Sequence, residues 1–314
     1  MHLTAKIYIA GHMGLVGSTI LNRLQKQGYT NIITRSYSEL DLTNQQKVED
    51  FFKDEKPEYV FLAAAKVGGI LANSTYPAEF IYQNMMIQNN ILHQSWLNGV
   101  RNLLFLGSSC IYPRLCPQPM KEEHLMTGPL EPTNSPYAVA KISGIEMCWA
   151  YNRQYNTNYI PVMPTNLYGP NDNFDLETAH VLPALIRKFH EAKTRNQDSV
   201  TVWGTGSPKR EFLHVEDMAE ACIHVMKNSD KLTEEDQTPL FNIGTGVEVT
   251  IKELAEVIKD IVGFKGEIVW DVTKPDGTPR KLLDLTRMTE FGWNAEIKLD
   301  EGIRKTYKLY IENT

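Results

Sequence analysis

Tyr137 and Lys141 bracket the sequence Tyr-Ala-Val-Ala-Lys, which opens a predicted helix. Residues four apart share one helix face, so the two side chains are expected to be neighbours. The charge of a lysine can lower the pKa of a nearby phenol. Such a tyrosine can then donate a proton to a carbonyl oxygen. The spacing alone is a weak signal, because surface pairs of this kind arise by chance, and its weight comes from residues upstream.

Ser108 and Cys110 follow an apolar run that predicts a strand over 103–106. Ligands of parallel α/β proteins bind at the carboxyl ends of strands, so the Ser108 hydroxyl can bond the same carbonyl oxygen. Capping of the strand end, which Ser109 could equally provide, is the alternative. If the strand continues to Cys110, alternation places the thiol on the same face as Ser108. A buried, inert cysteine is the competing interpretation.

A glycine-rich segment lies between the first predicted strand and the first predicted helix. Glycines allow a sharp turn and a close approach to a pyrophosphate, and the helix N-terminus offers free N–H groups to the negative charge. An ordinary glycine turn is the alternative, but the position within a β-α-β unit favours a dinucleotide. The residues predicted to contact the cofactor here are Gly11, His12, Met13, Gly14, Leu15, Val16 and Gly17.

Arg35 lies at the end of the second predicted strand, where NAD enzymes place an acid for the ribose hydroxyls. An arginine suits a 2′-phosphate instead, which favours NADPH over NADH. The alternative is a solvated strand end.

His180 precedes a predicted helix and follows a polar loop. Histidine is the most frequent general acid, although a single histidine is more often structural or on the surface. A Ser/His hydrolase is disfavoured, because the sequence contains no Gly-x-Ser-x-Gly elbow.

The elements that must position these residues alternate between strands and helices. Continuous apolar strands separated by helices indicate a parallel sheet with helices on both faces. We therefore predict an α/β fold of the Rossmann type, a doubly wound parallel sheet, with a smaller C-terminal α/β substrate domain. The predicted boundary separates residues 1–169 from residues 170–314, and later segments are allowed to return to the first domain. The predicted strands of the first part are 6–10, 32–34, 59–64, 103–106 and 159–164.

Composition limits the function classes. The chain has 314 residues, 32 basic and 38 acidic, and a net charge of −6, without a long basic run, so nucleic-acid binding is not expected. The most apolar stretch, 59–65, is too short to span a membrane. The four cysteines form neither a zinc pattern nor a disulfide framework, so we expect no metal and a cytoplasmic protein.

Longer segments of the sequence resemble those of a known protein family. The chain resembles the GDP-L-fucose synthases of the extended short-chain dehydrogenase/reductase family along nearly its whole length. The segments that carry the resemblance are AGHMGLVGS, LAAAKVGGI, FIYQNMMIQNNIL, LGSSCIYP, EPTNSPYAVAKI, MPTNLYGPNDNF, REFLHVEDMA, NIGTG and KPDGTPRKLLD.

The resemblance implies an NADPH-dependent homodimer that inverts C3 and C5 of a GDP-linked 4-keto-6-deoxyhexose and then reduces C4. It implies a reductive triad of Ser108, Tyr137 and Lys141, with Cys110 and His180 as the epimerisation base and acid. The substrate-binding residues that it implies are Lys188, Trp203, Arg210, Asp276 and Lys281. Further cofactor contacts are implied for Leu106, Gly107, Lys141, Pro164, Asn166, Leu167 and His180.

Two positions depart from the family pattern, Met13 and Thr178, the second of which stands where an amide residue is expected. The family often carries a basic residue where this chain has Met13, so more of the contact with the 2′-phosphate is left to Arg35 and His12. Two other functions stay open. A nucleotide-sugar 4-epimerase or 4,6-dehydratase would keep its NAD bound, but a dehydratase needs an Asp-Glu pair where this chain has Ser109-Cys110. A non-catalytic NADP-binding sensor would commonly lack part of the triad.

Overall fold

A parallel sheet is the centre of the molecule. The computed structural model describes residues 1–232, 237–274 and 276–312, and within them six strands form this sheet in the order β2-β1-β3-β4-β5-β9. All of its strand pairs are parallel. In that order, the strands are Ile32–Ile33, Ile7–Ala10, Tyr59–Leu62, Asn102–Leu106, Asn158–Pro164 and Phe241–Ile243.

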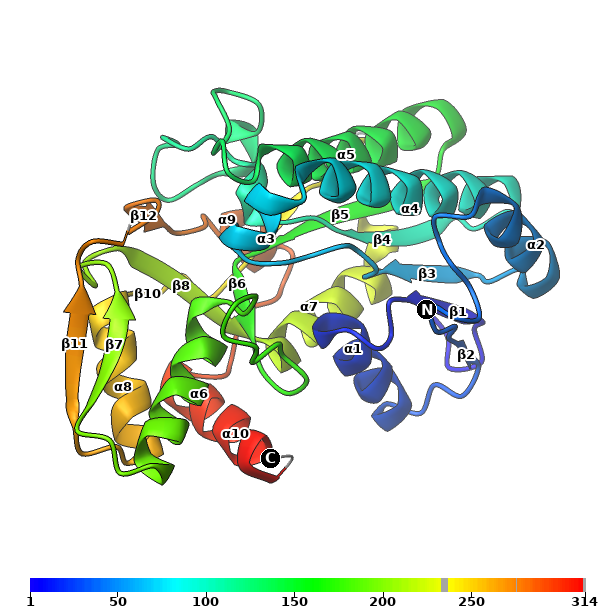
Figure 1. The fold of residues 1–314 in the computed structure, drawn as a ribbon. Coiled ribbons are helices and arrows are strands. Elements are labelled where there is room, and N and C mark those ends of the chain that lie inside the picture. The colour runs from blue at the N-terminus through cyan, green and yellow to red at the C-terminus, as the bar shows by residue number, and fades with distance from the viewer. Residues whose placement is uncertain (233–236, 275, 313–314) are drawn as a thin grey trace.

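Helices cover both faces of this sheet (Figure 1). One face carries α2, α4 and α5, which are Gln45–Glu55, Pro77–Leu97 and Ser135–Tyr155, and the short helix α3, Ile70–Thr75, precedes α4. The other face carries α1, Leu15–Lys26, and α7, Val215–Lys227. The strands are buried on both faces, so they are continuously apolar, as in other doubly wound sheets.

Capping residues fix where several helices begin. The side chain of Asn44 accepts a hydrogen bond from the backbone N–H of Lys47 and starts α2. Helix α8, Ile251–Val262, begins with a capping box between Thr250 and Glu253. It ends at Gly263, whose φ of 77° is the left-handed conformation that closes a helix.

The chain reverses its direction across the sheet between β1 and β3. From β1 it first moves to β2 on one side and then returns to β3 on the other, which is the topological switch point where such folds bind ligands. Gly11 lies at this point with φ of 88°, and a Cβ on Gly11 would come within 2.6 Å of the backbone nitrogen of Ala64. Only glycine allows this close approach.

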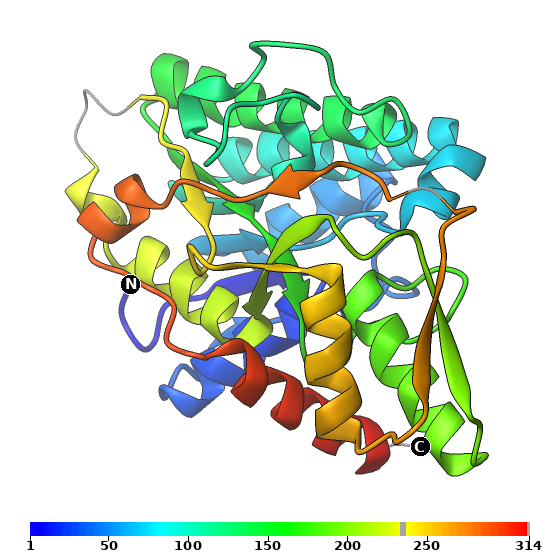
Figure 2. The ribbon, with the colours of Figure 1, turned by 90° about the vertical axis from the view of Figure 1, so that its left-hand side faces the viewer.

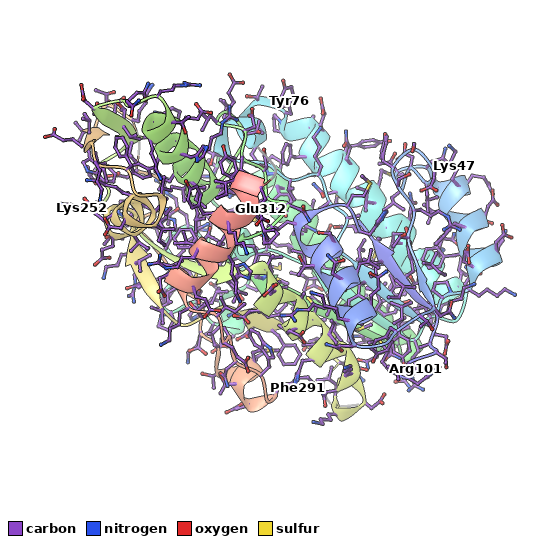
Figure 3. The ribbon with its side chains drawn as sticks, turned by 90° about the horizontal axis from the view of Figure 1, so that it is seen from below. Lys47, Tyr76, Arg101, Lys252, Phe291 and Glu312 are labelled. Carbon is purple, nitrogen blue, oxygen red and sulfur yellow. The ribbon has the colours of Figure 1, made fainter. Side chains whose placement is uncertain are left out.

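A second, smaller layer lies beside the sheet (Figure 2). In the described part of the chain, a four-stranded sheet combines β6, β8, β10 and β12, and a parallel pair combines β7 and β11. These strands are Asn166–Tyr168, Lys209–His214, Glu248–Thr250, Arg280–Lys281, Ser199–Trp203 and Glu267–Asp271. Three helices pack with them, α6, Val181–Thr194, α8, and α10, Leu299–Glu312. Viewed from below, α2 with Lys47 and α8 with Lys252 lie at opposite ends of the molecule (Figure 3).

The predicted fold class is confirmed. Segments of the second half return to the first, because β9 completes the large sheet and α7 packs against α1. The domain boundary at 169/170 stays a prediction. Several short strands were absent from the predicted elements, among them β6, β8 and β10, because two to six residues are too few for a clear periodic pattern.

Candidate active site

Ser108 and Cys110 lie on a tight turn at the carboxyl end of β4. The strand does not continue to Cys110, because β4 ends at Leu106, as predicted, and Ser109–Ile111 forms a 3₁₀ turn. The Ser108 hydroxyl accepts a hydrogen bond from the backbone N–H of Cys110 over 3.3 Å, which caps this turn and ends the strand. The two side chains are nevertheless kept together, by the turn instead of by strand alternation.

Tyr137 and Lys141 lie on the first turns of α5, which begins at Ser135 with a proline in its first turn. Lys141 is only 3% exposed, and its Nζ donates a hydrogen bond to the carbonyl oxygen of Leu106 over 2.7 Å. The same Nζ lies 5.9 Å from the centre of the Tyr137 ring. The end of β4 and the start of α5 therefore meet at one place, as the sequence predicted.

Burial is the largest cause of the pKa shifts of Tyr137 and Lys141. It lowers the pKa of Lys141 to about 8, against the opposing effect of Cys110. Burial, and secondly the Cys110 charge, raises the pKa of Tyr137 well above its ordinary value, while hydrogen bonding with Ser108 opposes the rise. The pKa of Tyr137 is therefore raised, contrary to the lowering that the Tyr-x-x-x-Lys spacing predicts. The phenol stays protonated, which is the form that a proton donor needs.

The Cys110 thiol is half-buried and lies among cations. Burial raises its pKa, whereas the Ser108 hydroxyl, the Lys281 charge and the Lys141 charge each lower it. Lys281 comes from β12, more than 170 residues further along the chain, and burial lowers its own pKa. The two lysine charges favour the thiolate, but burial outweighs them and leaves the pKa of Cys110 raised overall.

The glycine-rich loop fits a dinucleotide. A Cβ on Gly17 would lie 2.1 Å from the carbonyl oxygen of Gly11, so the loop is closed as tightly as backbone allows. The Nδ1 atom of His12 is buried, and no partner for it exists among the residues that the structure describes. A buried polar atom without a partner is suited to a bound ligand. Met13 is 72% exposed and leaves the loop open to solvent at that side.

The other predicted cofactor residues lie at neighbouring strand ends. Leu106 and Gly107 close β4, and Pro164 closes β5. Asn166 and Leu167 belong to β6, where the Asn166 amide donates to the backbone carbonyl of Glu211 over 2.8 Å. Leu106, Gly107 and Pro164 thus lie at the carboxyl ends of parallel strands, where the cofactor of this fold binds, and Asn166 and Leu167 follow the end of β5 closely.

Arg35 lies at the end of β2 but is already engaged. Its Nη2 lies 2.5 Å from a carboxylate oxygen of Glu55, and its Nη1 donates to the carbonyl oxygen of Thr34 over 2.8 Å. The guanidinium also lies over the Phe51 ring at 5.5 Å. A role toward a 2′-phosphate stays a prediction for this side chain.

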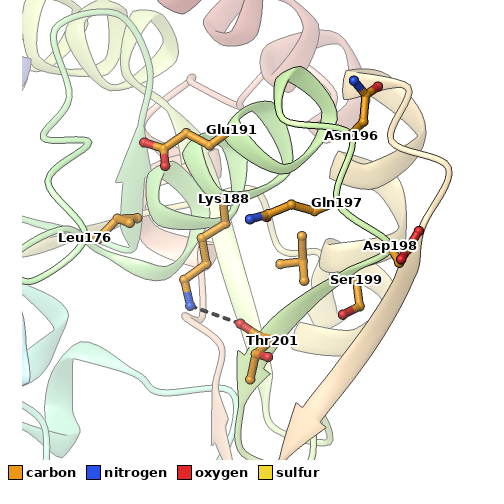
Figure 4. A pocket seen from close by; sticks show the side chains of 9 residues that line it. Leu176, Lys188, Glu191, Asn196, Gln197, Asp198, Ser199 and Thr201 are labelled. Carbon is orange, nitrogen blue, oxygen red and sulfur yellow. Dashed lines mark hydrogen bonds between the residues drawn. The ribbon is translucent and has the colours of Figure 1, made fainter.

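Lys188, on α6, lines a second polar region next to β7 (Figure 4). Trp203 is the last residue of β7. The Lys188 Nζ donates to the carbonyl oxygen of Thr201 over 3.1 Å and lies 5.9 Å from the centre of the Trp203 indole. Trp203 is 62% exposed, and the Lys274 Nζ lies 5.4 Å from the same ring. An adjacent pocket of about 700 Å³ is lined by Leu176, Lys188, Glu191, Asn196, Gln197, Asp198, Ser199, Val200 and Thr201.

Arg210 and Asp276 lie near this region, and both side chains already form hydrogen bonds with neighbouring residues. The Arg210 Nη1 donates to the carbonyl oxygen of Lys209, and burial lowers the pKa of Arg210. Both carboxylate oxygens of Asp276 already accept hydrogen bonds from Thr205, at 2.7 Å from its backbone nitrogen and 2.9 Å from its hydroxyl. Asp276 therefore holds the turn after β7. Pro275, at the start of the predicted loop, lies outside the described residues.

His180 is the N-cap residue of α6 and approaches from a separate loop. The backbone N–H of Gly69 donates to the carbonyl of Thr178 over 3.3 Å, which ties this loop to the start of α3. His180 is exposed, yet desolvation by surrounding protein atoms lowers its pKa. In the described part of the chain, no hydrogen bond joins its ring to Cys110. The structure thus groups Ser108, Cys110, Tyr137, Lys141 and Lys281, and the role of His180 as their partner stays a prediction.

Two acidic residues near the site were missed by sequence reasoning. Glu211 is fully buried, and its carboxylate accepts backbone hydrogen bonds from Thr245, Gly246 and Leu283. An acid within the apolar strand Arg-Glu-Phe-Leu-His could have indicated it. Glu39 accepts two hydrogen bonds from Ser36 beside Arg35, and nothing in a short polar loop distinguishes such an acid from a solvated one.

The described residues contain neither a candidate metal site nor a candidate membrane-spanning helix. Within residues 1–232, 237–274 and 276–312, no cluster of three or more His, Cys, Asp and Glu side chains could hold a metal ion. In the same residues, no helix has the length and apolarity needed to cross a bilayer.

Known proteins resemble this chain in sequence and in fold. The profile of the NAD dependent epimerase/dehydratase family matches residues 7–244. The chain belongs to this family. It is 59% identical over 313 residues to a putative GDP-L-fucose synthase 2 of Arabidopsis thaliana, covering 99% of this chain and 93% of that protein. It is 55% identical to a GDP-L-fucose synthase of Escherichia coli, covering 98% and 97%. The resemblance to GDP-L-fucose synthases is thereby confirmed.

A solved structure extends the comparison to the cofactor. The GDP-mannoheptose C4 reductase MlghC of Campylobacter jejuni, with NADP bound, is 43% identical. It superposes with a TM-score of 0.91 over 99% of both chains. Members of the family with this fold thus bind NADP, and the glycine-rich loop described above fits that group.

Proposed function

We propose that the protein converts GDP-4-keto-6-deoxy-D-mannose to GDP-L-fucose, by inversion at C3 and C5 followed by reduction of the C4 ketone with NADPH. The observation that carries the proposal is the Cys110 thiol on the same turn as Ser108, within charge range of Lys141 and Lys281. A reductase that only delivers hydride has no use for a thiol there. The names of the relatives at 55–59% identity support the same activity.

Inversion depends on the ketone. Protons at C3 and C5 are acidic because both carbons neighbour C4, and their removal leaves an enolate whose oxygen needs hydrogen-bond donors. Ser108 and Tyr137 are donors of the right type at the right place. The Cys110 thiolate removes the proton from one ring face, and His180 returns a proton from the other, since their ordinary pKa values lie closest to neutrality.

Reduction uses the same carbonyl. NADPH, when bound, supplies the hydride to C4. Tyr137 donates its proton to the C4 oxygen, and Ser108 holds that oxygen by a hydrogen bond. The buried Lys141, anchored on Leu106, holds the ribose next to the nicotinamide and replaces part of the lost solvation around the phenol. One site can therefore serve both steps.

The GDP portion is assigned to the second polar region. Lys188, Trp203 and Arg210 combine two cations with an exposed aromatic face, which suits a diphosphate and a purine base. Lys281 lies between this region and Cys110, and Asp276 supports the turn after β7.

The decisive assay supplies GDP-4-keto-6-deoxy-D-mannose and NADPH and determines the product stereochemistry by NMR. GDP-L-fucose supports the proposal. A second candidate is C4 reduction without inversion, which the likeness to the GDP-mannoheptose C4 reductase favours. That activity would yield a D-series GDP-6-deoxyhexose and would refute the epimerase half.

We also propose a homodimer formed through α4 and α5. The two long helices lie side by side on one face of the sheet (Figure 1). They expose apolar side chains beyond those that pack inward, namely Tyr82, Leu97, Val139 and Tyr155. A second copy of the same pair would cover them in a four-helix arrangement. Sedimentation equilibrium should give a dimer, and Tyr82→Glu with Leu97→Glu should give a monomer.

A cytoplasmic location fits the free thiols. Cys110, Cys116, Cys148 and Cys222 are all unpaired, a state that reducing compartments maintain. Fractionation of the source cells tests this proposal.

A further inference from the structure

Arg35 is only partly available to a cofactor phosphate. The Glu55 carboxylate forms ion pairs with the Arg35 guanidinium, at 2.5 Å, and with the Lys6 ammonium group, at 2.9 Å. Thr34 accepts from the other Arg35 nitrogen. A 2′-phosphate would have to share this guanidinium with a carboxylate that is already in place. The net attraction that Arg35 offers is therefore smaller than that of an unpaired arginine.

Glu39 places a second carboxylate at the same end of the site. Its Oε2 accepts from the backbone N–H and from the hydroxyl of Ser36, both over 2.7 Å. These two bonds, and then the charges of Arg35 and His12, lower the pKa of Glu39. Since His12 belongs to the glycine-rich loop, Glu39 lies within electrostatic range of both that loop and Arg35. In NAD enzymes an acid at the end of the second strand holds the ribose hydroxyls. Here Arg35 occupies that strand end, and Glu39 follows it by four residues.

The surroundings of Arg35 add further acids. A pocket of about 360 Å³ beside it is lined by Arg35, Glu39, Leu40, Lys47, Asp50, Phe51, Asp54 and Glu55. The lining thus has four carboxylates and two cations, and Lys6, paired with Glu55, adds a third cation. Met13 follows His12 in the glycine-rich loop, and Tyr37 lies two residues after Arg35. Both side chains are exposed and carry no charge. A dianionic phosphate meets more like charge than opposite charge in this pocket.

We propose that Glu39 and Glu55 are specificity-determining residues that leave the cofactor site open to NADH as well as NADPH. Glu39 accepts hydrogen bonds from the ribose hydroxyls of NADH. Glu55 pairs with Arg35 and thereby weakens the attraction of Arg35 for the 2′-phosphate of NADPH. The inference rests on the cofactor half of the proposed function and is independent of the sugar substrate.

The test measures binding without any sugar. Dissociation constants of NADPH and NADH, from quenching of protein fluorescence, should lie within about tenfold of each other for the wild type. Glu55→Gln should shift the ratio toward NADPH by about threefold or more, as expected for a partly buried ion pair. Glu39→Gln should shift it in the same direction, mainly by weakening NADH. Glu49→Gln, on the same helix but paired with Lys53, is the matched control and should leave the ratio unchanged.

Calorimetry with adenosine 2′,5′-bisphosphate and 5′-AMP isolates the phosphate contact. The affinity for the bisphosphate should rise in Glu55→Gln, while that for 5′-AMP stays constant. A wild-type preference for NADPH far above tenfold would overturn the proposal. A ratio that neither Gln substitution moves would also overturn it. Failure of the sugar assay with normal cofactor binding would instead refute the proposed sugar reaction.

Discussion

The backbone N–H of Cys110 donates a hydrogen bond to the Ser108 hydroxyl over 3.3 Å. One turn of chain thereby fixes both a hydroxyl suited to a carbonyl oxygen and a thiol suited to proton abstraction. The arrangement explains how two different steps can act on one ketone. If Ser108 holds the oxygen at C4, a thiol two residues away lies near the carbons on either side.

The Tyr137→Phe substitution removes the proposed proton donor. It should reduce turnover by about 10²–10⁴-fold, the usual contribution of general acid catalysis. NADPH binding, measured by fluorescence, should be unchanged, because Lys141 and the glycine-rich loop remain. Tyr155→Phe on the same helix is a suitable control. Wild-type turnover in a well-folded Tyr137→Phe protein would refute the assignment.

The Lys281→Met substitution tests whether Lys281, on β12, lowers the pKa of the Cys110 thiol. Because the charge of Lys281 lowers the pKa of Cys110, its removal should raise that pKa. The pH profile of Cys110 alkylation by iodoacetamide, followed by peptide mass spectrometry, should move to higher pH. The other three cysteines are buried and should react slowly. Lys274→Met, near Trp203, should leave the profile in place, and an unshifted profile in Lys281→Met would contradict the account.

Burial of Lys141 predicts a pH dependence of stability. Its pKa is about 8 in the folded protein and about 10.5 when unperturbed, so between these values the unfolded chain binds more protons. The cost of burying the charge is fully present below pH 8 and disappears as the pH rises toward 10.5. Relative to Lys141→Met, the wild type should gain up to about 1.4 kcal/mol per pH unit in that window. Urea unfolding at pH 7, 8, 9 and 9.5 checks this, and parallel curves for the two proteins would contradict it.

Much of the fold follows from patterns that the sequence displays. The five strands predicted in the first part of the chain all form, each within two residues of its predicted bounds, because an apolar run marks each of them. Strands β10 and β12 could not be predicted, since their pairing with β8 depends on long-range contacts and not on local propensity.

The candidate site was predictable in its residue types and less so in its contacts. The Tyr137/Lys141 spacing correctly placed the two on one helix face. The turn at Ser109 could not be foreseen, because it depends on the Ser108 hydroxyl capturing one backbone N–H. Nor could the pairing of Arg35 with Glu55, which joins a strand end to the last turn of α2, 20 residues later.

Proton exchange with solvent tests the central claim most directly. The protein is incubated in D₂O with NADPH and GDP-4-keto-6-deoxy-D-mannose, and deuterium at C3 and C5 is measured by NMR. The wild type should incorporate deuterium at both carbons. Cys110→Ser should lose this exchange yet still reduce the uninverted ketone slowly, because a serine hydroxyl is far too weak an acid to serve as the base. His180→Gln should depress epimerisation, and Cys222→Ala, a buried thiol on α7, should behave as the wild type. Exchange at the wild-type rate in Cys110→Ser would show that another group removes the protons and would contradict the account.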